Sequence, residues 1–183
     1  VATNQNDILH RAITNGAYNV ENVSETISPS MDIQIASNFE RLIFDLNNHS
    51  DKKTIDVMKD IKEKGKYEFQ KENLDKINID FLSSRMDENE VLNTIKTVYE
   101  KFDKVLDPHS AIGYGAFDKV NLKGNNIVLA TAHPCKFPDA IEKAINIKAE
   151  LPNELAFILD EKENYDILEN NLNKIKQHIK ERI

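Results

Sequence analysis

The chain of 183 residues contains no tryptophan, a single cysteine, five glycines and five prolines. So little glycine and proline, without any low-complexity tract, excludes a fibrous or intrinsically disordered chain. A lone Cys135 cannot form an internal disulfide and cannot by itself make a thiolate zinc site. We therefore expect a globular protein with one core, or one core plus an appendage, in a reducing compartment such as the cytoplasm.

Positive charge and long apolar runs are also scarce. The chain has 24 Lys and Arg residues against 31 Asp and Glu residues, a formal net charge of −7. This balance disfavours a protein built to neutralise nucleic-acid phosphates or anionic lipid. No apolar run approaches the roughly 20 residues that cross a bilayer, and no charged head followed by an apolar stretch opens the chain. We expect neither nucleic acid nor membrane as a partner.

The first 46 residues predict a strand, a turn and two helices. Val1-Ala2-Thr3 has the composition of a strand interior, and no methionine precedes it, so we expect that an N-terminal part is missing. Polar residues then precede an apolar helical pattern over residues 8–13. A second helix is predicted over residues 39–46, where apolar residues recur at i, i+3, i+4 and i+7.

The composition shifts between residues 47 and 90, where Lys, Asp and Glu are dense and apolar residues are thinly spread. We interpret this stretch as a charged, solvated helical insertion between two parts of a large domain, residues 1–46 and 91–183. Asp87 and Glu90 resemble a capping box, and the apolar spacing after them predicts a helix over residues 91–105.

The last part predicts a helix with small residues at 108–116, which would allow close approach to a neighbour or a ligand. The continuous apolar run 127–130 is typical of a strand buried on both faces in a parallel sheet. Further helices are predicted from Pro138, over residues 152–159 and over residues 168–179. Alternating strands and helices favour an α/β fold, but two strands are too few for an independent sheet.

Thr131 follows the predicted strand, at the position where open α/β sheets bind ligands. The alternative is that Thr131 only caps the turn into the helix at Pro138. His133 is open to the same two interpretations. Five histidines without an i, i+4 pair argue against a metal site, so we expect none.

Asp107, His109 and Ser110 place a carboxylate, an imidazole and a hydroxyl within four residues. The members of a nucleophilic triad are usually distant in sequence, so a helix cap is the better interpretation. Cys135 lies near a helix start, where a thiol could be acidified, but packing is the more common role of such a residue. No reaction follows from these residues alone.

Two further loops are candidates. Asn6-Asp7 and Ser30-Met31-Asp32 are possible site loops, with helix capping as the alternative. The sequence has no glycine-rich phosphate loop, because the turn at residues 123–126 precedes the predicted strand instead of following it. Its geometry is therefore wrong for cradling a phosphate at a helix N-terminus.

Five segments, taken in order, resemble threonine synthases. They are Ala2-Thr3-Asn4-Gln5-Asn6-Asp7-Ile8-Leu9, Ser28-Pro29-Ser30-Met31-Asp32-Ile33, Ser37-Asn38-Phe39-Glu40-Arg41, Leu106-Asp107-Pro108-His109-Ser110-Ala111 and Ala130-Thr131-Ala132-His133-Pro134. The resemblance extends over nearly the whole chain and is weakest at residues 47–90. It implies the C-terminal portion of a pyridoxal 5'-phosphate enzyme of the tryptophan-synthase-like fold (fold type II), helix-rich with a few parallel strands.

The resemblance also implies an activity: a lyase that converts O-phospho-L-homoserine and water to L-threonine and phosphate. It assigns to Thr131 the hydroxyl that meets the pyridine nitrogen of the cofactor. The family's Schiff-base lysine and its phosphate-binding loop have no counterpart here and would lie upstream of Val1. We therefore assign no catalytic residue within the chain and expect the chain alone to be inactive and to need the N-terminal portion of the same polypeptide.

Two alternatives remain open at this point. The chain could belong to another fold-type-II pyridoxal-phosphate lyase, such as a serine or threonine dehydratase, which would release no phosphate. It could also be a non-catalytic, helix-rich interaction module that keeps the shape of an enzyme without its chemistry. Removal of half of a domain would leave strand edges and an apolar face exposed, so we expect the fragment to form dimers or aggregates.

Overall fold

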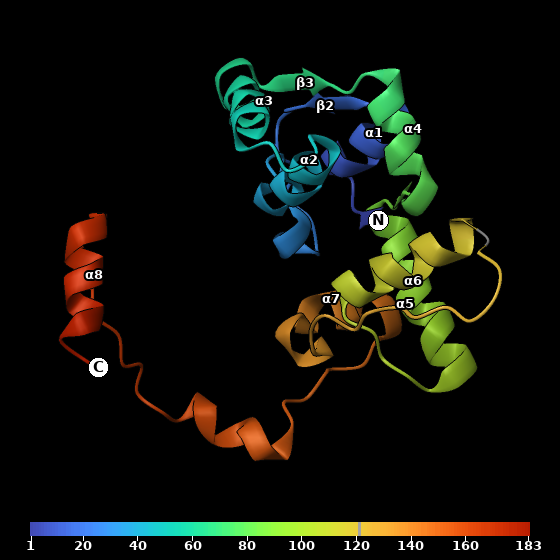
Figure 1. Cartoon of the computed structure of the whole chain (residues 1–183). Coiled ribbons are helices and arrows are strands. Elements are labelled where there is room, and N and C mark those ends of the chain that lie inside the picture. Colours follow the sequence, from blue (N-terminus) through green and yellow to red (C-terminus); the bar gives the residue numbers. More distant parts are fainter. Residues whose placement is uncertain (121) are drawn as a thin grey trace. The chain divides into compact units, whose positions relative to one another are not determined.

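The computed structural model describes residues 1–120 and 122–183, which fall into two units, Val1–Glu150 and Leu151–Ile183 (Figure 1). The helices of the first unit are α1 (Ile8–Asn15), α2 (Glu40–Leu46), α3 (Asp51–Lys64), α4 (Lys71–Asp80), α5 (Glu88–Phe102), α6 (Pro108–Val120) and α7 (Pro138–Ile145). Its strands are β1 (Ala2–Thr3), β2 (Ala17–Asn19), β3 (Lys66–Glu68) and β4 (Ser84–Arg85). Short 3₁₀ turns lie at η1 (Pro29–Met31), η2 (Ser37–Phe39) and η3 (Pro134–Lys136).

The four strands form two separate pairs. Strands β1 and β4 pair in parallel, with Ala2 opposite Ser84. Strands β2 and β3 pair antiparallel, with Tyr18 opposite Tyr67, and run side by side in Figure 1. The parallel pair therefore joins the start of the chain to a segment about eighty residues further on.

A first hydrophobic core gathers around α1. Helix α1 buries the apolar residues that predicted it, and ends at Gly16, whose φ of 79° is readily adopted by glycine. Residues 47–90 take part in this core, which the interpretation of a solvated insertion did not foresee. The fully or nearly buried members of this core are Ile8, Ala12, Ile13, Tyr18, Ala36, Phe39, Ile43, Ile61, Phe69 and Ile77.

The reason for the difference is the spacing of the buried residues in residues 47–90. Helix α3, strand β3 with its following residue, and helix α4 contribute one main apolar contact each, Ile61, Phe69 and Ile77. Residues so far apart form no continuous stripe in the sequence, yet they converge because β3 pairs with β2 beside α1. The boundaries 1–46, 47–90 and 91–183 themselves stay a prediction.

A second core lies between α5, α6 and α7. The capping box at the start of α5 is confirmed: the Asp87 carboxylate accepts from the Glu90 N–H at 2.9 Å, and the Glu90 carboxylate accepts from the Asp87 N–H at 2.9 Å. The helix ends at Phe102, three residues before the predicted end. The buried members of this core are Met86, Val91, Ile95, Ala111, Ile112 and Ile141.

The predicted strand at residues 127–130 is wrong. This segment has no regular secondary structure, and its side chains are exposed, Ile127 by 90% and Leu129 by 74%. A strand buried on both faces needs neighbouring strands to accept and donate its backbone hydrogen bonds. None of the strands in the described residues pairs with it.

The C-terminal helices are only partly as expected. The helix at Pro138 is confirmed as α7, whereas the predicted helix at 152–159 is a 3₁₀ helix, η4 (Asn153–Leu159). The last helix, α8 (Leu172–Lys180), begins later than predicted because Asn171 caps it, accepting from the backbone N–H groups of Asn173 and Lys174. None of the helices within residues 1–120 and 122–183 has both the length and the apolar character needed to cross a membrane.

Candidate functional site

Asp107 organises the N-terminus of α6. It is 1% exposed, and its carboxylate accepts hydrogen bonds from the backbone N–H groups of His109 (2.9 Å) and Ser110 (3.3 Å). It also accepts from His109 Nδ1 (3.0 Å) and from the Ser110 hydroxyl. These bonds satisfy the otherwise unpaired N–H groups of the first helical turn, so the predicted helix cap is confirmed.

The same bonds exclude a nucleophilic triad. In a triad the serine hydroxyl donates to the imidazole, which is oriented by the carboxylate. Here both Ser110 and His109 donate to Asp107. The hydroxyl therefore faces a carboxylate instead of the imidazole nitrogen that would take up its proton.

His109 joins α6 to the loop that contains Ser30. Its Nε2 accepts from the Ser30 backbone N–H at 3.3 Å, while its Nδ1–H donates to Asp107. This pattern assigns the neutral tautomer with the proton on Nδ1. The ring also lies 4.7 Å, centroid to centroid, from the Phe137 ring. With both nitrogens engaged, His109 serves to hold elements together.

Thr131 lies beside the same helix N-terminus. Its backbone N–H donates to the Ser110 hydroxyl oxygen at 3.1 Å. The capping alternative is not observed, because the residue that precedes α7 is Phe137 and no side chain caps that helix. Thr131 instead lines a hollow of about 660 Å³, together with Met31, His109 and Gly113 among others.

Among the described residues, His133 caps a turn and Cys135 lies on that turn. The His133 Nδ1 accepts from the backbone N–H of Cys135 at 3.2 Å and so caps the 3₁₀ turn η3. Cys135 itself is half-buried on that turn. Within residues 1–120 and 122–183 no three His, Cys, Asp or Glu side chains come close enough to hold a metal ion.

The two candidate loops, Asn6-Asp7 and Ser30-Met31-Asp32, are brought together through Asp32. One oxygen of its carboxylate accepts from the side-chain amides of Asn4 (2.7 Å) and Asn6 (2.9 Å) and from the Thr26 hydroxyl (2.6 Å). Its other oxygen accepts from the Thr26 backbone N–H at 2.8 Å. The network ties the end of β1 to the segments on both sides of η1, and no pattern in the sequence pointed to Thr26.

Asp7 does not cap α1, although capping was the predicted alternative. Its side chain makes no cap hydrogen bond and instead pairs with Arg11, one turn further along the helix, at 2.8 Å. Arg11 also donates to the Asn19 carbonyl at 2.9 Å, which holds the end of β2 against α1. This pair is therefore structural.

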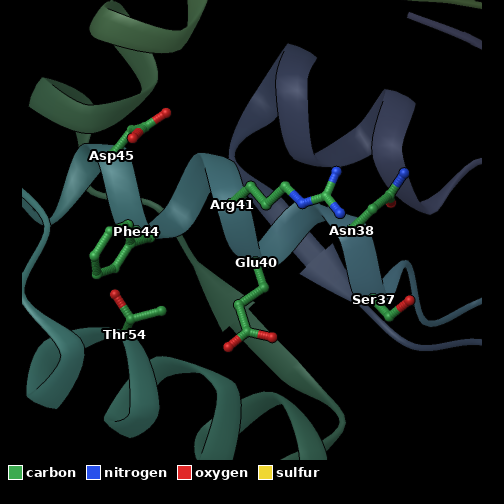
Figure 2. Close-up of a pocket in the computed structure, with 7 residues that line it drawn as sticks. All are labelled: Ser37, Asn38, Glu40, Arg41, Phe44, Asp45 and Thr54. Carbon is green, nitrogen blue, oxygen red and sulfur yellow. The ribbon is translucent and has the colours of Figure 1, made fainter.

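A second hollow of about 500 Å³ lies along α2, at the motif that begins with Ser37. Figure 2 shows that Arg41 extends toward Asn38, whereas Glu40 points to the other side, toward α3. The charged groups do not converge on one point. The remaining residues that line this hollow are Ser37, Phe44, Asp45 and Thr54.

The geometry favours the first hollow as the candidate site. It is lined by Thr131, whose backbone is hydrogen-bonded to Ser110, and by the apolar surface of Gly113, Ala116 and Val128. Mostly apolar walls with a few placed polar groups are typical of small-molecule sites. The lining residues lie on α6, on η1, at the end of α4 and in the segment that leads to Thr131.

Comparison with known proteins identifies relatives along nearly the whole chain. A family model described as threonine synthase, C-terminal, matches residues 110–179. The threonine synthase of Pseudomonas aeruginosa is 37% identical over 182 residues, which cover 98% of this chain and 39% of that protein. The threonine synthase of Saccharomyces cerevisiae is 38% identical over 165 residues, covering 80% of this chain and 32% of that protein.

Solved structures agree with the sequence comparisons. A threonine synthase from Brucella melitensis with bound PLP has a TM-score of 0.84 at 38% identity, covering 98% of this chain and 39% of that chain. The yeast enzyme has a TM-score of 0.79 at 34% identity, covering 98% and 41%. The predicted helix-rich fold of this class, with few parallel strands, is therefore confirmed.

The chain spans about two-fifths of the length of the relatives it matches most fully. Within that span the sequence similarity and the structural similarity cover the five motifs, helix α6 and the segment beside it that holds Thr131. The chain therefore belongs to the threonine synthase family, as the C-terminal portion of such a protein.

Proposed function

We propose that this chain is the C-terminal portion of an enzyme that converts O-phospho-L-homoserine and water to L-threonine and phosphate, in threonine biosynthesis. The observation that carries the proposal is the similarity over 98% of the chain to a PLP-bound threonine synthase, with a TM-score of 0.84. Since that similarity covers 39% of the other chain, the activity belongs to a longer polypeptide. The lone Cys135 is compatible with the cytoplasm as its compartment.

Thr131 is the residue we propose for binding the cofactor, pyridoxal 5'-phosphate. Its N–H is held by Ser110, whereas no hydrogen bond of its hydroxyl is found in the described part of the chain. A hydroxyl can donate to a pyridine nitrogen or accept from it. Gly113 and Val128 offer apolar surface nearby, on which a flat ring would pack. The residues present therefore fit the cofactor.

A neutral hydroxyl at this position has a chemical consequence. When bound, the cofactor supplies an electron sink for carbanions. Unlike a carboxylate, the Thr131 hydroxyl does not hold a proton on the ring nitrogen, so the ring withdraws electrons less strongly. His109, in its neutral tautomer, adds no positive charge to the same wall of the hollow. These residues thus bind and tune but do not transfer the substrate's protons.

The amine that carries the cofactor is proposed to come from outside this chain. Among the described residues, those that line the hollow include no lysine. Ile127 and Leu129 border the same hollow and are largely exposed. We therefore propose that the remainder of a longer polypeptide packs on this side, brings the lysine and the phosphate-binding loop, and buries these side chains. The chain alone is then inactive.

The first experiment is the intact mass of the native polypeptide from its source cell after borohydride reduction, which locks bound cofactor onto lysine. We expect a mass well above 21.0 kDa with one cofactor added, and phosphate release from O-phospho-L-homoserine. Turnover without phosphate release would instead favour a dehydratase. A mass of 21.0 kDa without cofactor would contradict the proposal and favour an interaction module.

Thr131→Val in that native polypeptide tests the site. We expect the affinity for pyridoxal 5'-phosphate and kcat/KM to fall by about tenfold, the effect of losing one hydrogen bond of roughly 1.4 kcal/mol. The shape of the side chain is preserved. Thr131→Ser is the matched control and should keep most of the affinity. Equal affinity of wild type and Thr131→Val, by cofactor titration, would show that the hydroxyl has no such role.

A further inference from the structure

Ser110 lies between the carboxylate of Asp107 and the backbone of Thr131. The serine is 3% exposed. Its hydroxyl donates to Asp107 Oδ2, and its oxygen accepts from the Thr131 N–H at 3.1 Å. A hydroxyl has one hydrogen and two lone pairs, and an ionised carboxylate can only accept. The hydrogen therefore points to Asp107, and a lone pair is left for Thr131.

The acceptor end of this arrangement is rigid. Asp107 is fixed by the backbone N–H and the imidazole of His109, and its own carbonyl accepts from the Ala111 N–H at 2.9 Å as the first bond of α6. Ala111 and Ile112 on α6 belong to the second core. Ser110 lies in the first turn of this packed helix, and its hydroxyl is held by a buried carboxylate.

The donor end is held much less firmly. Residues 127–130 have no regular secondary structure, and η3 begins only at Pro134. For residues 127–132, the bond to Ser110 is the one hydrogen bond found in the described part of the chain. The position of the Thr131 backbone, and with it the hydroxyl at the hollow, thus depends on a single side chain.

We propose that Ser110 is a positioning residue for Thr131: by accepting the Thr131 N–H, it holds the Thr131 hydroxyl at the edge of the hollow. The proposal rests on the cofactor role proposed above for Thr131. A reacting or binding group misplaced by about 1 Å can cost roughly 100-fold in rate, which is why such support matters. The bond itself can be tested without any cofactor.

The test is amide hydrogen exchange of Thr131, measured by NMR on the native polypeptide without cofactor. In wild type we expect the Thr131 amide to exchange about tenfold or more slowly than an unstructured amide, because it is hydrogen-bonded. Ser110→Ala should remove this protection, and Ser110→Thr, which keeps the hydroxyl, should restore it. The matched control is Ser50→Ala, which removes a serine hydroxyl elsewhere, the cap of α3.

Two results of the exchange experiment would overturn the proposal. One is an unprotected Thr131 amide in wild type, which decides the question even if Ser110→Ala does not fold. The other is unchanged Thr131 protection in a folded Ser110→Ala chain. Loss of protection in Ser110→Ala with protection retained in Ser50→Ala supports it.

Titration of the native polypeptide with pyridoxal 5'-phosphate separates this proposal from the cofactor role of Thr131. We expect Ser110→Ala to raise the Kd by about tenfold, near the effect of Thr131→Val, since one hydrogen bond is lost in each. An altered Kd in Thr131→Val but not in Ser110→Ala would overturn the positioning role alone. A Kd unchanged in both would overturn the cofactor role, while the exchange data would still report the Ser110–Thr131 bond.

Discussion

Tyr18 is a buried residue whose polar atom has a hydrogen-bond partner. Its ring stacks on Phe39 with centroids 5.6 Å apart, and its hydroxyl accepts from the Ala36 backbone N–H at 2.9 Å. Burial raises the pKa of the Tyr18 hydroxyl, so it remains protonated. The hydroxyl thus supplies the acceptor that the buried N–H of Ala36 needs.

Tyr18→Phe should lower the free energy of unfolding by about 1–2 kcal/mol, because the Ala36 N–H would be left buried without an acceptor. The measurement is urea unfolding, in which the midpoint falls while the slope stays constant. Tyr165→Phe is the control, since Tyr165 is 70% exposed and should change stability by less than about 0.5 kcal/mol. Equal losses in the two variants would contradict the expectation.

At the scale of elements, α6 approaches its neighbours closely at a glycine, as its small residues predicted. A Cβ atom added at Gly115 would lie 2.3 Å from Met86 Cε and 2.9 Å from Thr94 Oγ1. Met86 is itself buried in the second core. A side chain at this position would therefore force the buried side chain of Met86, after β4, and that of Thr94, on α5, to shift.

Gly115→Ala should destabilise the chain by about 1–3 kcal/mol through overpacking against Met86. Gly113→Ala on the same helix is the matched control. Its added Cβ would lie 3.3 Å from Val128, in a segment without regular structure that can yield, and alanine favours the helix. We expect thermal unfolding to show a loss for Gly115→Ala and no loss for Gly113→Ala. The reverse order would contradict the packing argument.

The start of α5 carries an acid-sensitive contact. Lys119 Nζ lies 2.6 Å from Glu90 Oε1, and this hydrogen bond, followed by that from the Asp87 N–H, lowers the pKa of Glu90 below its ordinary value of 4.5. Because the pKa is lower in the folded chain, the stabilisation is complete above the ordinary value. It is lost as the pH falls through the folded-state value.

Glu90→Gln keeps an acceptor for the Asp87 N–H but removes the charge that faces Lys119. We expect a loss of about 0.5 kcal/mol at pH 7, the modest effect of a partly exposed ion pair. The loss should shrink to nothing in acid, as followed by urea midpoints across a pH series. Glu100→Gln, whose partner Lys96 lies 3.9 Å away, should show less effect at every pH. A difference between wild type and Glu90→Gln that is constant with pH would contradict the assignment.

The features that the sequence predicted correctly are local. The capping box of α5, the apolar stripe of α1 and the cap at Asp107 depend on residues within a few positions of one another. The strand at 127–130 failed because a strand is stabilised by partners elsewhere in the chain. Ile61 and Ile77 were placed in a solvated insertion for the same reason, since their burial depends on α1 and β2.

The candidate site divides in the same way. Thr131 could be singled out because it follows an apolar run. The bond from Ser110 to Thr131, across 21 residues, and that from Asn6 to Asp32, across 26, could not be predicted. The sequence does not show which hydrogen-bond donor pairs with which acceptor when the two lie far apart along the chain. Only the fold of α6 and of the segment around η1 brings them within reach.

At the scale of the whole molecule, an apolar surface remains without a partner. Phe81 and Leu82 after α4, with Ile127 and Leu129, are exposed around the hollow. Contiguous apolar surface of this kind favours association. We therefore predict that the isolated chain forms dimers or larger species, in addition to any packing against a longer polypeptide.

Leu129→Glu should shift the isolated chain toward the monomer, because a charge in this surface must be desolvated on association. The measurement is sedimentation velocity over a concentration series. Ile55→Glu is the control, since Ile55 is also an exposed apolar residue but lies on α3, away from the hollow. A 21.0 kDa monomer at every concentration of the wild-type chain would rule out the prediction.

The parallel pair of β1 and β4 also sets an order of events when the chain is made. Pairing Ala2 with Ser84 closes a loop of about eighty residues, which costs conformational entropy. The hydrogen bonds of only two paired residues offset little of this cost. At about 5–20 residues per second, β1 leaves the ribosome roughly 4–16 s before its partner strand does. During that interval its backbone donors and acceptors are open to any other strand. Strand β1 is therefore a place where a chaperone, or the wrong neighbour, has time to bind before β4 is available.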